Sequence, residues 1–138
     1  MFPKIRHIDD VLPYIKDIDE FAVIEKDGYT VIDYLFMGGE TFKGETNSLS
    51  MNIRKECRGI AFDTNGNIIS RPLEKFFNVG EKEETMPENL DWSGDNLVMD
   101  KLDGSMLRPL YLEDGFRMGT RKGITDVSIL AENLRKAC

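Results

Sequence analysis

The sequence has little of what metal centres and exported proteins use: two cysteines, one histidine and no long hydrophobic run. Cys57, Cys138 and His7 are too few for a four-ligand zinc site. No apolar run approaches the ~20 residues that cross a bilayer, and residues 1–7 lack the apolar core of a secretion signal. With seven methionines and no export signal, this composition predicts a reducing, cytoplasmic setting.

Positive charge is also scarce, since 18 lysines and arginines face 25 acidic residues and the net charge is −7. Such a chain is unlike a protein that coats nucleic acid non-specifically. Yet residues 101–138 carry a net charge of +2, which fits a localised anion pocket and a basic helix face equally well. At 41% hydrophobic content the chain supports one modest globular unit, and we expect a single domain over residues 1–138.

Apolar segments separated by Asp-Gly or Asn-Gly steps predict three antiparallel hairpins. The expected strand pairs are 21–25 with 29–36, 56–63 with 67–71, and 106–112 with 116–120. An acidic, solvated connection is expected over residues 80–95. The fold class is therefore predicted to be α+β, with antiparallel β-hairpins and a few flanking helices.

The helices are expected to be short and to lie at three places. One spans residues 8–19, with Asp9 as N-cap, and another begins near residues 47–52. The last follows Thr125 as its cap. Their apolar residues at helical spacing are Val11, Leu12, Ile15 and Ile18 in the first helix, and Val127, Ile129, Leu130 and Leu134 in the last.

The stretch around Lys101 is the first candidate for chemistry. An apolar run, Leu97–Met99, leads into this lysine, and Asp103-Gly104 follows, which predicts a strand that ends in a tight turn. Gly104 permits a positive φ and lets a ligand approach the main chain. Desolvation or neighbouring cations turn a lysine into a nucleophile. Lys-x-Asp-Gly alone is weak evidence, because a solvated lysine on a hairpin turn explains it as well.

Further blocks place cationic side chains where predicted strands end. They are Glu-Cys-Arg-Gly at 56–59, Ser-Arg-Pro-Leu-Glu-Lys-Phe-Phe-Asn at 70–78, and Arg-Lys-Gly at 121–123. If the hairpins fold together, these cations converge with Lys101 on one pocket that binds a polyphosphate. The cations in question are Arg58, Lys75, Arg121 and Lys122.

In this order and spacing, the blocks resemble the nucleotidyltransferase (adenylation) domain of ATP-dependent RNA ligases. The resemblance is to the bacteriophage tRNA-repair type, to which fungal tRNA ligases are related, within the covalent nucleotidyltransferase superfamily. It extends from about Tyr29 to Gly123, and the block at 70–78 is its most distinctive part. It implies that residues 1–138 are the N-terminal half of such a domain, and that a viral protein would act in the host cytoplasm.

The resemblance also implies a mechanism. In that family the motif lysine attacks the α-phosphate of ATP, and the lysyl-adenylate passes to an RNA 5′-phosphate that a 3′-hydroxyl then attacks. Lys101 would be the catalytic nucleophile, ATP and Mg²⁺ the cofactors, and RNA with 5′-phosphate and 3′-hydroxyl ends, expected to be tRNA, the partner. No metal ligand and no membrane contact are implied. The implied ATP-binding residues are Tyr34, Arg58, Lys75, Gly104 and Lys122, and for Arg58 and Lys75 the resemblance equally allows contact with the RNA 5′-phosphate end.

Each of these roles has a structural alternative. Arg58 and Arg71 suit ion pairs at strand edges, and Lys122 suits a solvated strand end. The aromatic residues that suit the core instead of a base-binding site are Tyr34, Phe76 and Phe77.

The later family motifs, which hold a ribose-binding glutamate and triphosphate-binding lysines, do not follow Gly123. We therefore expect weak or no complete ligation from these 138 residues. Three other functions stay open: a non-catalytic nucleotide- or RNA-end-binding module with the ligase fold, a DNA ligase or capping guanylyltransferase, and a purely structural fragment.

Overall fold

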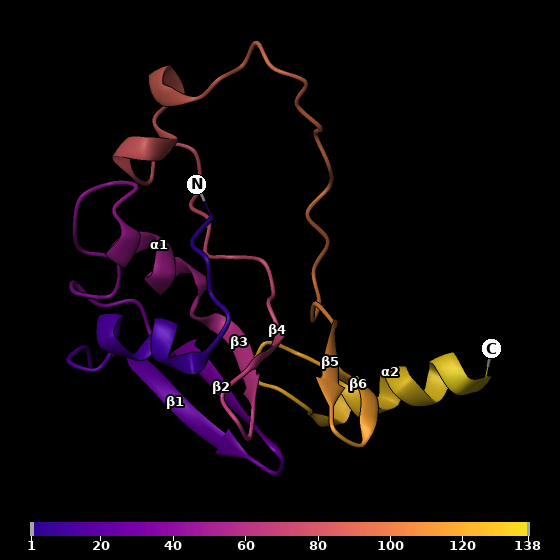
Figure 1. Cartoon of the computed structure of the whole chain (residues 1–138). Coiled ribbons are helices and arrows are strands. Elements are labelled where there is room, and N and C mark those ends of the chain that lie inside the picture. Colours follow the sequence, from indigo (N-terminus) through magenta and orange to yellow (C-terminus); the bar gives the residue numbers. More distant parts are fainter. Residues whose placement is uncertain (1, 138) are drawn as a thin grey trace.

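The computed structural model describes residues 2–137 and contains two antiparallel sheets (Figure 1). A four-stranded sheet has the order β1-β2-β3-β4, and a two-stranded sheet pairs β5 with β6. The strands are β1 (Phe21–Lys26), β2 (Tyr29–Tyr34), β3 (Arg58–Asp63), β4 (Ile68–Ser70), β5 (Arg108–Leu112) and β6 (Gly115–Gly119). The helices are α1 (Leu49–Glu56) and α2 (Asp126–Ala137), with 3₁₀ turns at Ile8–Asp10, Leu12–Tyr14, Glu83–Thr85 and Pro87–Asn89. The predicted α+β class and its three hairpins are confirmed.

The larger sheet divides the core into two layers. Because side chains alternate along a strand, Val31 and Ile32 of β2 point to opposite faces, and both are fully buried. Ile32 packs with Val11 of the N-terminal segment and Ile53 of α1. Val31 packs with Leu110 of β5. One face is thus covered by the N-terminal turns and α1, and the other by the β5–β6 hairpin.

The N-terminal segment does not form the single helix expected over residues 8–19. It forms two 3₁₀ turns, and the residue that caps the first is His7, not Asp9. Pro13 explains the break, because it has no N–H to donate to a carbonyl four residues earlier. Of the predicted apolar stripe, Val11 and Ile15 are buried.

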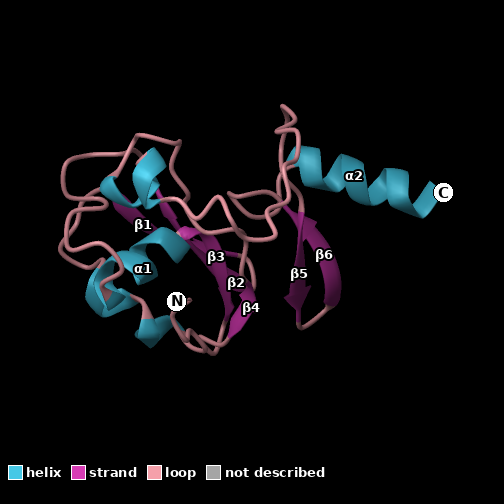
Figure 2. Cartoon of the chain, turned by 90° about the horizontal axis from the view of Figure 1, so that it is seen from above, coloured by secondary structure: helices cyan, strands magenta, loops and turns pink. Residues whose placement is uncertain are grey.

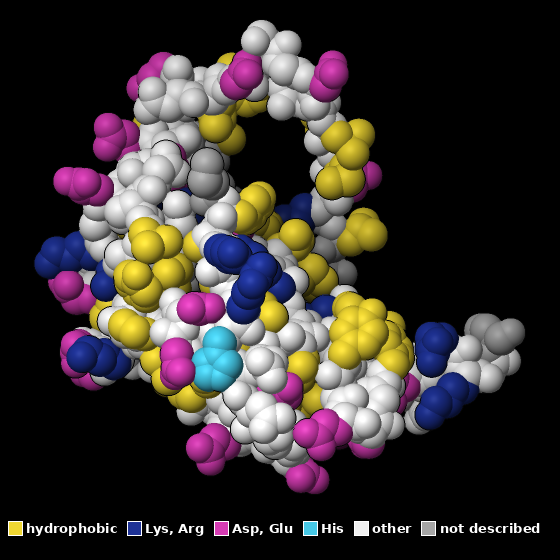
Figure 3. All heavy atoms as spheres, viewed as in Figure 1, with side chains coloured by type: hydrophobic (Ala, Val, Ile, Leu, Met, Phe, Trp, Pro, Cys, Tyr) yellow, Lys and Arg dark blue, Asp and Glu magenta, His cyan; other side chains and the backbone are white. Residues whose placement is uncertain are grey.

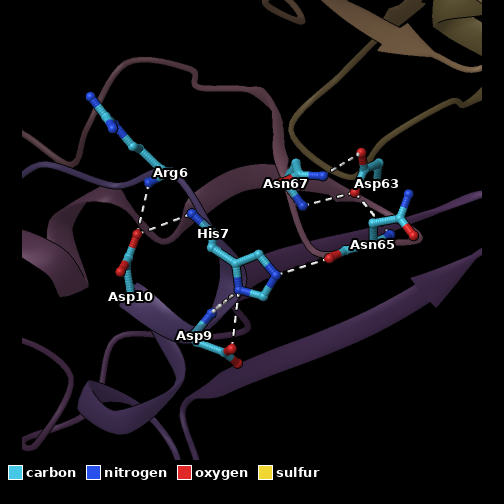
Figure 4. A network of polar contacts seen from close by, with 7 residues as sticks. All are labelled: Arg6, His7, Asp9, Asp10, Asp63, Asn65 and Asn67. Atoms are coloured by element: carbon cyan, nitrogen blue, oxygen red, sulfur yellow. Dashed lines mark hydrogen bonds and ion pairs between the residues drawn. The ribbon is translucent and has the colours of Figure 1, made fainter.

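His7 fastens this segment to the β3–β4 turn (Figure 4). Its Nε2 lies 2.9 Å from the carbonyl oxygen of Asn65, and its Nδ1 lies 3.1 Å from the carboxylate of Asp9. Asp63 closes the turn by accepting hydrogen bonds from the backbone N–H groups of Asn65 and Asn67. A side chain on Gly66 would collide with the His7 ring. The turn sequence therefore fixes both the hairpin and its contact with the N-terminus.

Helix α1 takes part of the segment expected to be a strand. Ser48 caps the helix by accepting a hydrogen bond from the N–H of Met51, and α1 continues through Glu56. As a result β3 begins at Arg58 and not at residue 56. Helix and strand meet at Cys57, which is fully buried.

The long connection before β5 contains no strand at residues 97–99, so that prediction is wrong. Residues 91–107 form an arch without helix or strand, and Figure 3 shows an opening between it and the body. A strand needs a neighbour to take its hydrogen bonds, and none pairs with this segment within residues 2–137. Leu97 and Val98 are 80% and 93% exposed. Trp92, at the start of the arch, is also exposed and donates to the carbonyl oxygen of Pro87.

Helix α2 projects away from the body beside the β5–β6 hairpin (Figure 2). As predicted it follows Thr125, whose carbonyl oxygen accepts from the N–H of Ile129. It is the polar face, with Ser128 and Glu132, that is buried. The exposed face carries the predicted apolar positions Val127, Ile129, Leu130 and Leu134. Within residues 2–137, neither this helix nor any other is long and apolar enough to cross a membrane.

Glu132 joins α2 to β6 and gives a test of this arrangement. Its carboxylate accepts from the N–H of Met118 at 2.6 Å and from Nε of Arg117 at 3.0 Å, and these contacts lower its pKa. Glu132→Gln should lower the free energy of unfolding by about 1 to 2 kcal/mol at pH 7, measured by urea unfolding followed by circular dichroism.

The pH dependence has a definite sign. Because the pKa of Glu132 is lower in the folded protein, its contribution is complete above its ordinary pKa near 4.5 and is lost as the pH falls through the folded value. The difference between wild type and variant should therefore shrink in acid. The exposed Glu113→Gln serves as control, and an equal loss in both variants would contradict this role of Glu132.

Candidate functional site

A cleft of about 590 Å³ opens where the larger sheet meets the end of the β5–β6 hairpin. Its walls come from the ends of β1, β2 and β3, from the residues before β5, and from the residues after β6. The lining residues are Ile24, Lys26, Asp33, Tyr34, Leu35, Arg58, Gly104, Ser105, Met106, Thr120, Arg121 and Lys122.

A β-bulge positions the cleft's wall on the larger sheet. Ile32 pairs with Ile60, but Asp33 pairs with Arg58, so Gly59 is an extra residue in β3. Gly59 has φ +91°, and a Cβ there would collide with the backbone carbonyl of Arg121. Glycine thus allows the bulge, which sets Asp33 and Arg58 opposite each other, and lets the chain after β6 approach.

Arg121 connects the two sides of the cleft. Its Nε donates to Oδ1 of Asp33 and its Nη2 to the carbonyl oxygen of Tyr34, both at 2.7 Å. Its guanidinium carbon lies 4.1 Å from the centroid of the Tyr34 ring. Burial raises the pKa of Asp33, and the hydrogen bond and charge of Arg121 oppose that rise. One arginine therefore satisfies a buried carboxylate and covers one face of an aromatic ring.

Two further arginines have buried nitrogens without hydrogen-bond partners among the described residues. Arg108 donates through Nη2 to the carbonyl oxygen of Gly59, while its Nε and Nη1 have no partner. Burial lowers the pKa of Arg108 to about 10. Nε of Arg58 is likewise buried without a partner. Arg58, in the cleft wall, and Arg108, behind it, therefore carry N–H groups that can donate further hydrogen bonds.

The structure brings four of the six predicted site residues together. Tyr34, Arg58, Gly104 and Lys122 all line the cleft, although they come from separate parts of the chain. Lys101 does not line it; this lysine is exposed on the arch, three residues before Gly104.

Lys75 does not line the cleft either. Its Nζ donates to the carbonyl oxygen of Phe76 and lies 4.6 Å from the centroid of the Phe77 ring. The expected convergence of all the cationic blocks on one pocket is therefore wrong for the block at 70–78.

The structural alternatives hold for some residues. Arg71 forms a two-pronged ion pair with the buried Glu56, at 2.7 and 2.8 Å, and is thus a structural residue. Phe77 is half-buried and packs edge-to-face on Phe42, while Phe76 is 55% exposed. Tyr34 is both a buried aromatic and a cleft residue.

The sequence did not single out Arg121 and Asp33 as partners. They lie 88 residues apart, and the Arg-Lys-Gly block alone does not indicate which cation turns inward. A signal was present in the sequence of β2, where the charged Asp33 stands between Ile32 and Tyr34 in a strand that is almost entirely buried.

The cleft does not offer a ready magnesium site. Asp33 is the one carboxylate among its lining residues, and Arg121 already binds it. Nowhere in residues 2–137 do three acidic, histidine or cysteine side chains gather as a metal site. Mg²⁺ prefers carboxylate oxygens and retained waters, so the described residues do not fit a resident Mg²⁺, and we assign it no protein ligand.

Comparison with known proteins gives the family. A family model described as RNA ligase matches residues 56–137, which include most of the cleft-forming segments. The chain belongs to the RNA ligase family. It is 32% identical over 124 residues to a putative RNA ligase of Thermovibrio ammonificans, covering 88% of this chain and 30% of that protein. It is 31% identical over 137 residues to RNA ligase 1 of bacteriophage TS2126, covering 94% and 32% respectively. This RNA ligase family chain thus spans less than a third of these relatives.

The Asp33–Arg121 pair gives a direct test of the cleft geometry. Arg121→Gln leaves Asp33, which is 4% exposed, without its cation, and should lower the free energy of unfolding by about 2 kcal/mol at pH 7. The deficit should shrink as the pH falls, because protonation removes the unpaired charge of Asp33. Urea unfolding at two pH values measures both effects.

Two variants control for this result. Lys122→Gln changes the neighbouring, exposed cation and should leave stability nearly unchanged. Arg121→Gln combined with Asp33→Asn should recover part of the loss, since no buried carboxylate remains. A deficit that stays constant with pH and is not relieved by Asp33→Asn would contradict the assigned pair.

Proposed function

We propose that this chain is the N-terminal part of the nucleotidyltransferase domain of an ATP-dependent RNA ligase of the tRNA-repair type. The observation that carries the proposal is the cleft, which gathers Tyr34, Arg58, Gly104 and Lys122 from four segments; Gly104 lies three residues after Lys101 in the chain. Membership of the RNA ligase family supports the reaction class. The activity of a whole ligase is also a proposal, because this chain spans less than a third of its relatives.

The cleft suits a nucleoside triphosphate. Arg58 and Lys122 supply cations for phosphate oxygens, and an arginine can bind them with two hydrogen bonds. Gly104 has φ +133°, and no atom lies within 4 Å of where its Cβ would be, so phosphate can approach the backbone there. Tyr34 and Leu35 add apolar surface for the base.

Lys101 is proposed as the nucleophile. Its neutral amine attacks the α-phosphorus of ATP, a nitrogen–phosphorus bond forms, and the bond to the β-phosphate oxygen breaks. The amine proton passes to solvent and pyrophosphate leaves. Because the arch has no strand or helix, Lys101 can approach the cleft without breaking a hydrogen-bonded ladder.

The later steps involve RNA. The adenylate passes from Lys101 to a 5′-phosphate, and a 3′-hydroxyl displaces AMP to form the phosphodiester. Broken tRNA is the substrate class that we propose, on the strength of the block at 70–78. Both similar proteins are named RNA ligases, and one belongs to a bacteriophage.

The test is an intact mass spectrum after incubation with ATP and Mg²⁺. The wild type should gain one adenylate, and Lys101→Ala should gain none, because the attacking nitrogen is absent. Lys16→Ala, an exposed lysine away from the cleft, is the matched control and should gain the adenylate like the wild type.

Two outcomes would contradict the proposed chemistry. An adenylate on Lys101→Ala would place the nucleophile elsewhere. If the wild type and Lys101→Ala bind ATP or RNA ends equally well, and the wild type gains no adduct, the chain is instead a non-catalytic binding module with the ligase fold.

A further inference from the structure

Three lysine ammonium groups surround one aromatic ring outside the cleft. The Nζ atoms of Lys75, Lys82 and Lys55 lie 4.6, 5.4 and 5.7 Å from the centroid of the Phe77 ring. We call these four residues the Phe77 cluster. Like charges repel when they gather, and the ring's negative face offsets only part of that repulsion. On a chain of net charge −7, such a gathering indicates a place for an anion.

Most of this charge is not neutralised within the described chain. Lys55 is buried and pairs with Glu84 at 2.5 Å. Lys75 and Lys82 form no ion pair with any carboxylate of residues 2–137. Nζ of Lys75 donates one hydrogen bond, to the carbonyl oxygen of Phe76, so Lys75 and Lys82 both keep N–H groups for an external anion.

A hollow beside the ring gives the anion room. It has a volume of about 360 Å³, and its walls include Phe77, Phe42 and the two lysines Lys43 and Lys82. Gly39 and Gly44 of the loop before α1 also line the hollow, and because they have no side chains they do not narrow it. The carboxylates on its rim are Glu83 and Glu84, and Glu84 is already bound by Lys55.

Phe76, which lies between Lys75 and Phe77 in the chain, contacts an arginine of the cleft. Arg58 lines the cleft, and its guanidinium carbon lies 5.5 Å from the centroid of the Phe76 ring. Phe76 is 55% exposed, and its neighbours in sequence, Lys75 and Phe77, belong to the cluster. Aromatic side chains interleaved with cations are the pattern of single-stranded nucleic-acid grooves, where rings stack bases and cations track the backbone.

We propose that Lys75 and Lys82 bind backbone phosphates of a single-stranded RNA, with a base on Phe76 and the strand's end directed past Arg58 into the cleft. This rests on the proposed function and deepens it by defining where the RNA lies. Of the two roles that the resemblance left open for Lys75, it chooses RNA over ATP, because Lys75 does not line the cleft. The triphosphate of ATP is the competing source of phosphate groups.

The experiment measures RNA binding without ATP. Fluorescence anisotropy follows the 138-residue chain as it titrates a labelled, 5′-phosphorylated oligouridylate of about twelve nucleotides at several salt concentrations. Lys82→Gln should weaken binding about fivefold to tenfold at low salt and reduce the salt slope by about 0.7, the value of one lost phosphate contact on a single strand. Adding Lys75→Gln should weaken binding by about a further fivefold to tenfold and reduce the slope by about another 0.7. Lys82→Glu should weaken binding more than Lys82→Gln.

Lys16→Gln is the matched control, since Lys16 is exposed and distant in sequence from the cluster; it should match the wild type in affinity and slope. Equal urea unfolding midpoints for all variants exclude loss of fold. Unchanged affinity and slope in both Lys82 variants, or a wild type that does not bind the RNA, would overturn the proposal. Weakened binding of a fluorescent ATP analogue with unchanged RNA binding would overturn it too, by assigning the cluster to ATP. Because ATP is absent from the RNA assay, a failure to form the adenylate cannot produce any of these RNA-binding results.

Discussion

The cleft depends on the ion pair between the buried Asp33 and the partly exposed Arg121. Asp33 is the residue before the last in β2, an inner strand of the larger sheet, and Arg121 follows β6, the last strand of the smaller one. No other side-chain hydrogen bond described here joins the end of β2 to the turn after β6. Gly59 makes the approach possible, because any larger residue would meet the Arg121 carbonyl. The pair therefore fixes the turn after β6 against the end of β2, while Arg108 to Gly59 and Ser70 to Pro109 join the sheets elsewhere.

An ion pair with a buried partner fixes geometry more than it adds stability, since desolvation opposes the attraction of its charges. Here the fixed geometry has a chemical consequence. Arg121 turns inward onto Asp33 and Tyr34, and its neighbour Lys122 is left exposed at the cleft. Arg58 is held opposite Asp33 by the bulge. A well-ordered framework thus presents cations to a ligand, while Lys101 lies on an arch without regular structure.

The sequence predicted what local chemistry determines. Asp-Gly and Asn-Gly steps located all three hairpins, and Tyr34, Arg58, Gly104 and Lys122 do meet in one cleft. The helix expected over residues 8–19 was wrong, because Pro13 interrupts its hydrogen bonds. The strand expected over residues 97–99 was wrong, because its apolar pattern needs a neighbouring strand that residues 2–137 do not supply.

Two features of the site could not be predicted, because each depends on contacts between distant segments. Arg121 and Lys122 are equivalent cations in the sequence, and only the packing of β6 against the larger sheet selects Arg121 for Asp33. Lys75 was expected in the cleft from its block, yet the turn of the chain after β4 directs it to Phe77. Residues of this one block thus lie at two places: Lys75 lies at the Phe77 ring, and Arg71 forms an ion pair with the buried Glu56.

We propose that a nucleotide binds in the cleft formed around Asp33 and Arg121. The most direct measurement is the change in backbone amide NMR shifts when a non-hydrolysable ATP analogue is added. We expect the largest changes at Tyr34, Arg58, Gly104 and Lys122, and little change at the β3–β4 turn, Asn65–Gly66, which does not line the cleft. Changes centred on that turn, or on the Phe77 cluster with the cleft unaffected, would contradict the proposal.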